Sequence, residues 1–72
     1  MKLSLDEFNE LQRWMKVRDC CQETMKNLRL ARELANGHNL DSKRFMEAYD
    51  FASELEVKAI RKIDKMVGEE ND

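Results

Sequence analysis

Proline is absent from this 72-residue chain, glycine occurs only twice, and histidine occurs once. Without proline, no position removes the backbone donor that an uninterrupted helix needs. A single histidine, His38, leaves no plausible set of zinc ligands. The chain also has no phosphate-binding glycine loop and no nucleophile paired with a base. We therefore expect neither an enzyme nor a bound cofactor or metal.

The only two cysteines, Cys20 and Cys21, are adjacent. Neighbouring side chains on a helix point about 100° apart, so this pair cannot staple two distant segments together. We expect Cys21 to be a small core residue and Cys20, on the less apolar side, to lie at an interface.

Long apolar runs are missing as well. No stretch approaches the roughly 20 residues that a membrane span requires, and the N-terminus lacks the apolar core of a secretory leader. Unpaired cysteines are typical of a reducing compartment. These features predict a cytoplasmic protein that does not associate with membranes.

The composition of the chain, with 42% hydrophobic and 39% charged residues, is typical of a helical protein. Ser4 followed by Glu7 matches a capping box, and Gly37 matches a helix stop, which together predict a first helix over about residues 5–36. Asp41 is a good N-cap, and an apolar face continues to a second glycine, Gly68, which predicts a second helix over about residues 42–67.

A connection of about five residues makes two helices antiparallel neighbours. The expected fold is therefore an all-α, antiparallel two-helix hairpin over residues 1–68, followed by a mobile acidic tail at 69–72. Pairing outward from residue 39 places Val67 opposite about Leu11. Because the first helix is expected to be longer, the segment around Leu5 and Phe8 should project beyond the hairpin.

A chain of this size rarely gains more than about 3–5 kcal/mol from its own core without a disulfide, a metal or a partner chain. Several apolar residues also fall outside the seam between the predicted helices. Both observations favour a homodimer that forms a four-helix bundle, with a dedicated protein partner as the alternative. The residues expected to mediate self-association are Leu5, Phe8, Cys20, Leu30, Met46, Phe51 and Val57.

The antiparallel arrangement also predicts a basic end, far from the loop, that surrounds an aromatic residue. Such a cluster can bind an acidic protein surface or a phosphate backbone. The simpler interpretation is a solvated charged face with Trp14 in the core, and the net charge of −2 does not favour nucleic acid. The residues of this basic end are Arg13, Trp14, Lys16, Arg18, Lys58, Arg61, Lys62 and Lys65.

The expected architecture resembles Rop-type plasmid regulators, which are helical hairpins that dimerise into four-helix bundles and bind RNA. The segments MKVRDCCQ (15–22) and LDSKRFMEAYDFA (40–52) resemble the Hha family of nucleoid-associated modulators. The first likeness is of design alone, and the second covers about a third of the chain, so neither assigns a family. The sequence favours a self-associating, non-enzymatic protein that binds a protein partner as a regulator or inhibitor. A nucleic-acid-associated regulator is the alternative.

Overall fold

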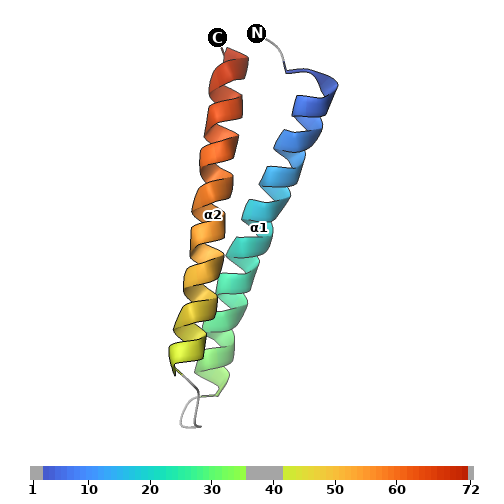
Figure 1. Ribbon diagram of the computed structural model, residues 1–72. Helices are drawn as coiled ribbons and strands as arrows, with labels where there is room; N and C mark the ends of the chain where they lie inside the picture. The colour runs from blue at the N-terminus through green and yellow to red at the C-terminus, as the bar shows by residue number, and fades with distance from the viewer. Residues whose placement is uncertain (1–2, 36–41, 72) are drawn as a thin grey trace.

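A computed structural model describes residues 3–35 and 42–71 of the chain, with side chains described up to Gly68. These residues form two antiparallel helices, α1 (Leu5–Leu34) and α2 (Ser42–Asn71), each of 30 residues (Figure 1). The molecule is a rod of 54 × 16 × 16 Å. Its radius of gyration is 16.3 Å, whereas a compact domain of this length would have about 11 Å. The predicted all-α hairpin is confirmed.

The start of α1 is fixed by the capping box that the sequence predicts. The Glu7 backbone N–H donates to Ser4 Oγ at 3.2 Å, and the Ser4 N–H donates to Glu7 Oε1 at 3.2 Å. At the other end Ala35 is the C-cap, and its N–H donates to the Ala31 carbonyl at 2.9 Å. The helix thus ends about two residues before the predicted boundary. The predicted stop at Gly37 and cap at Asp41 lie outside the described residues.

The prediction that Gly68 ends the second helix is wrong. α2 continues through Gly68 to Asn71, because glycine in a helix costs only about 1 kcal/mol relative to alanine and does not break hydrogen bonding. The mobility expected for residues 69–72 stays a prediction.

Equal helix lengths also remove the overhang that the sequence suggested. Leu5 and Phe8 are nevertheless exposed, at 75% and 49%. They lie about 160° and 100° around α1 from the buried Met25, so neither side chain points into the seam. The helices also lie closest beside the connection and diverge toward the two termini (Figure 1).

The register of the hairpin follows the predicted pairing. Arg29 Nη1 donates to the Tyr49 hydroxyl at 2.7 Å, and these two residues are each ten positions from residue 39. One turn nearer the connection, the Arg32 guanidinium lies 5.2 Å from the centre of the Phe45 ring. Phe45 in turn stacks on Tyr49, with ring centres 6.0 Å apart. Pairing outward from residue 39 is therefore confirmed.

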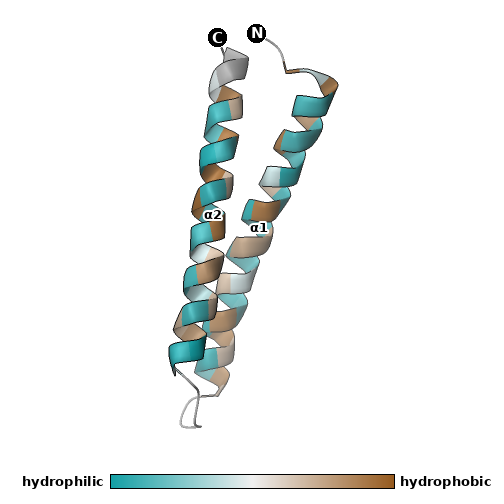
Figure 2. Ribbon diagram, in the orientation of Figure 1, coloured by the Kyte–Doolittle hydropathy of each residue, from teal (hydrophilic) through white to brown (hydrophobic). Residues whose placement is uncertain are grey.

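The core is a narrow seam between the helices. Ala59 is completely enclosed, which allows the two backbones to approach closely. Both helices also carry apolar residues that the structure leaves exposed, because two helices shield only one stripe of each other. The buried residues are Leu11, Cys21, Met25, Ala52, Ala59 and Met66. The exposed apolar residues include Phe8, Ala31, Leu34, Ala48, Ile60 and Val67. Hydrophobic residues accordingly appear on outward turns of both helices as well as between them (Figure 2).

Candidate functional site

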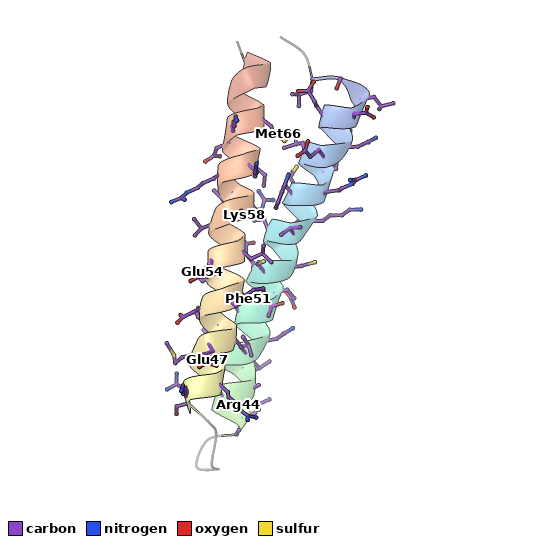
Figure 3. The ribbon with its side chains drawn as sticks, in the orientation of Figure 1. Arg44, Glu47, Phe51, Glu54, Lys58 and Met66 are labelled. Atoms are coloured by element: carbon purple, nitrogen blue, oxygen red, sulfur yellow. The ribbon has the colours of Figure 1, made fainter. Side chains whose placement is uncertain are left out.

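An apolar groove runs along one side of the hairpin, between α1 and α2. Its volume is about 900 Å³. Apolar side chains from both helices form its walls. Lys16 lies at one end of the groove, and Arg44 and Glu47 lie toward the connection between the helices. Figure 3 shows Arg44, Glu47 and Phe51 in order along α2. The apolar lining residues are Val17, Cys20, Cys21, Ala48, Phe51, Ala52 and Leu55, with Thr24 beside them.

Two of the residues expected to mediate self-association, Cys20 and Phe51, line this groove from opposite helices. Phe51 exposes 68% of its surface. An exposed phenylalanine in an apolar groove is the pattern expected of an interface rather than of an ordinary surface position. The groove was not identified from the sequence, although the spacing of Ala48, Phe51 and Leu55 by three and four residues was a signal for it.

The two cysteines differ as the sequence predicts. Cys21 is buried at the base of the groove, and Cys20 is exposed at its edge. Burial, and then the negative charge of Glu56 and the neighbouring Cys20, raises the pKa of the Cys21 thiol above its ordinary value. Cys21 is therefore a protonated, poorly nucleophilic thiol at neutral pH.

The other residues expected to mediate self-association do not share the groove. Met46 and Val57 are exposed on α2, but they lie about 140° and 120° around the helix from Phe51, and hence on one further side together. Leu30 lies about 80° around α1 from Cys20. With Leu5 and Phe8 at the diverging end, the seven residues occupy at least three separate surfaces.

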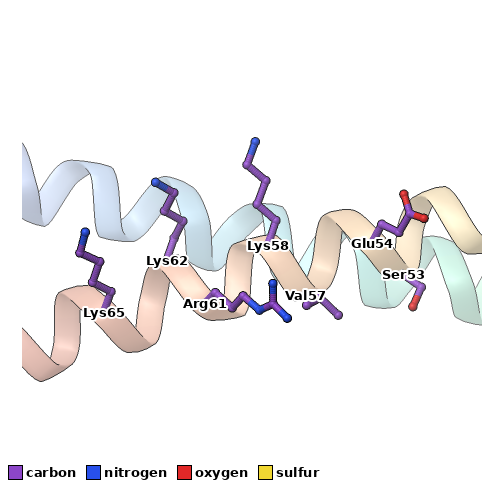
Figure 4. A pocket seen from close by; sticks show the side chains of 7 residues that line it. All are labelled: Ser53, Glu54, Val57, Lys58, Arg61, Lys62 and Lys65. Atoms are coloured by element: carbon purple, nitrogen blue, oxygen red, sulfur yellow. The ribbon is translucent and has the colours of Figure 1, made fainter.

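The four basic residues that the sequence assigned to the basic end of the second helix do come together. Lys58, Arg61, Lys62 and Lys65 line a shallow hollow of about 640 Å³ along α2, with Ser53, Glu54 and Val57 (Figure 4). The ammonium groups of the three lysines extend to one side of the helix, whereas the Arg61 side chain runs along it toward Val57 (Figure 4). This surface is positively charged toward the C-terminal half of α2 and contains one acid, Glu54.

The α1 members of the predicted basic end lie apart from that hollow. Arg13 and Trp14 line a different one, which also contains Asp6 and Glu10. The Trp14 Nε1–H donates to Glu10 Oε1 at 3.4 Å. In this hollow two acids offset one base, and the indole is half-buried.

Two further basic residues of α1 are also separated. Arg18 forms an ion pair with the adjacent Asp19 at 3.1 Å, and Lys16 lies at the end of the apolar groove. Apart from Arg18, the members of the predicted basic end thus line three different hollows of the surface, and a single binding surface around Trp14 stays a prediction.

Within the described residues, no three side chains of histidine, cysteine, aspartate or glutamate are arranged to hold a metal ion. Neither helix, over the same residues, has a stretch that is long and apolar enough to cross a membrane. Comparison with protein-family models, with curated proteins and with solved structures found no match to this chain.

Proposed function

We propose that two copies of this hairpin associate through the apolar groove to form a four-helix bundle. The observation that carries the proposal is the exposure of Phe51, a large aromatic side chain that lines the apolar groove and is 68% exposed. The narrow seam between α1 and α2 supports it, because a core built from one pair of helices leaves most of their apolar side chains in water.

We infer further that the dimer acts by occupying a surface on another protein, as a small regulator or inhibitor. A groove-mediated dimer leaves the side of α2 that carries Met46 and Val57 accessible, and Arg61 lies beside Val57 in the basic hollow. Exposed apolar residues next to arginine are a common composition of protein interfaces. The chemistry favours a partner helix or groove that is apolar with an acidic edge.

The two levels of this proposal are tested separately. Size-exclusion chromatography with light scattering, over a range of concentrations up to about 0.5 mM, measures the mass of the particle in solution. A dimer is expected, and a well-folded monomer throughout that range would refute the bundle.

Partner binding is tested by affinity capture with the wild-type chain and with Met46→Asp/Val57→Asp, followed by binding measurements on the purified candidate. The substituted chain should remain dimeric and lose the partner. Lys26→Glu, an exposed change on α1, is the matched control and should retain it. Equal affinity of all three chains would show that this side of α2 is not the contact surface.

Binding to nucleic acid is the second candidate function, and the hollow with Lys58, Arg61, Lys62 and Lys65 favours it. Phosphate contacts weaken as salt rises, with a slope that reflects their number. Fluorescence anisotropy of labelled RNA and DNA oligonucleotides, at about 50 and 200 mM salt, measures this dependence. Binding that is salt-sensitive and lost in Arg61→Glu/Lys62→Glu would support the function, and absence of binding at low salt would exclude it.

A further inference from the structure

Next to the groove, α2 carries a row of charged residues, one of which lines the groove while the other three line the neighbouring basic hollow. The order of these charges points to the occupant of the groove. The row is Glu47, Glu54, Lys58 and Lys65, and all four side chains are exposed. Their positions are separated by seven, four and seven residues, so the spacing is the same in both directions along the helix. The charges, in contrast, change from acidic to basic at the midpoint, residue 56.

We propose that the groove is occupied by a second copy whose α2 runs antiparallel to that of the first, with the two-fold axis beside residue 56. This arrangement rests on the dimer proposed above and specifies its geometry. Glu47 then lies opposite Lys65 of the second copy, and Glu54 lies opposite Lys58 of the second copy. Two-fold symmetry repeats each pair, so four oppositely charged contacts border the interface.

Helix geometry explains why this row can border a groove-to-groove dimer. Residues separated by seven, four and seven positions remain within about 40° of one line on a straight helix. Phe51 and Leu55 lie on the groove side of that line, and Glu47 itself lines the groove. Packing the two grooves together thus buries Phe51 and leaves the charges at the rim, as in antiparallel bundles with apolar seams and charged edges.

The neighbouring charges agree with the same axis. Asp50 is six residues before residue 56 and Lys62 is six residues after it, so they also have opposite signs across the axis. Arg44, at the end of the groove, falls opposite Gly68 of the second copy and meets no cation there. A parallel arrangement would instead place each of these charged residues beside the identical residue of the second copy, so that like charges meet at every position.

Charge reversal tests the pairing. Glu54→Lys and Lys58→Glu should each raise the dimer dissociation constant by about 5- to 30-fold at low salt, since each change places like charges together twice in the dimer. The double variant Glu54→Lys/Lys58→Glu restores opposite charges across the axis and should return the constant to within about threefold of wild type. Lys26→Glu, outside the interface, should have no effect. Sedimentation equilibrium at about 20 and 300 mM salt measures all of these.

Direction is tested by a single spin label at residue 43, introduced as Lys43→Cys in a Cys20→Ser/Cys21→Ala background. Because both cysteines line the groove, light scattering must first show that this background forms the same dimer as the wild-type chain. Residue 43 is 13 positions from the proposed axis, so the two labels of an antiparallel dimer lie about 40 Å apart along the bundle. In a parallel dimer they would be within about 20 Å. Double electron–electron resonance distinguishes these distances.

A dimer with the short distance, or one whose charge reversals are not rescued in the double variant, would overturn the antiparallel pairing while leaving the groove-mediated dimer intact. A chain that stays monomeric would overturn both. A dimer with the long distance and rescued charge reversals would support both.

Discussion

The most informative perturbation of this molecule is Phe51→Ala, since Phe51 adds little to the hairpin and much to the proposed dimer. A phenylalanine side chain has about 200 Å² of surface to bury. With 68% exposed in the hairpin, about 140 Å² remains for burial by a second copy. At about 25 cal/mol per Å², this burial is worth about 3 kcal/mol per chain as an upper limit.

Truncation removes this burial from both copies, and about half of the combined upper limit would raise the dimer dissociation constant about 100-fold, which is the expected effect. Sedimentation equilibrium measures this change, and thermal unfolding at several concentrations provides a second readout. The unfolding midpoint of the wild-type chain should rise with concentration, because association stabilises the folded state by mass action. The midpoint of Phe51→Ala should depend on concentration much less.

Val57→Ala is the matched control for Phe51→Ala. Val57 is an exposed hydrophobic residue of the same helix, but it lies about 120° around α2 from Phe51. Its truncation should leave the dissociation constant within about threefold of wild type, as expected of a site that association does not bury. If Phe51→Ala and Val57→Ala weakened the dimer equally, or if neither did, the groove would not be the association surface.

Four further predictions concern the hairpin itself. Gly68→Ala should raise the free energy of unfolding by about 0.5–1 kcal/mol, since Gly68 is helical and a Cβ there meets nothing within 4 Å; chemical denaturation that showed a loss of stability would mean that the helix ends at this residue. Ala59→Leu should destabilise the chain by about 1–3 kcal/mol, because it overpacks an enclosed position. Ala31→Leu, at an exposed position, is the control and should not destabilise it. Equal unfolding midpoints for the two variants would contradict the close approach of the helices at Ala59. Cys20 should react with iodoacetamide at least about ten times faster than Cys21 at pH 7.5, a difference that denaturant should abolish. Because the pKa of Cys21 is raised, the folded state holds the thiol proton more tightly than the unfolded chain does. The protonated thiol therefore contributes fully to stability below the unfolded pKa of about 8.5, and this contribution is lost as pH rises through the folded pKa. Cys21→Ala should reduce this alkaline loss of stability in urea titrations, and an unchanged pH profile would contradict the prediction.

The features that could be predicted from the sequence are those set by neighbouring residues. The capping box at Ser4 and Glu7 involves residues three apart, so its hydrogen bonds follow from local geometry. The Arg29 and Tyr49 contact joins distant residues, yet its register was predictable because a short connection leaves few ways to pair two helices. The end of α2 could not be predicted in the same way. Gly68 is compatible with both a helix stop and a helix interior, and helix propensity alone does not choose between the two.

The candidate site was less predictable for a different reason. The sequence identified Phe51 and Cys20 as residues outside the main seam, but it placed them in one set with Met46, Val57 and Leu30. Whether exposed residues share a surface depends on how each helix is rotated about its axis relative to the other, and hydrophobic spacing fixes that rotation only approximately.

The sequence by itself determined that this chain forms two antiparallel helices in a defined register, the first beginning at a capping box, because backbone hydrogen bonding and turn length are local properties. The tertiary structure alone decided which side chains the helices cover. By fixing helix rotation, it enclosed Ala59 and left Phe51 exposed beside the groove. The charged row of α2 shows the same division. Its spacing is set by the sequence, whereas the position of Glu47 in the groove and of Glu54, Lys58 and Lys65 in the basic hollow depends on how the two helices pack.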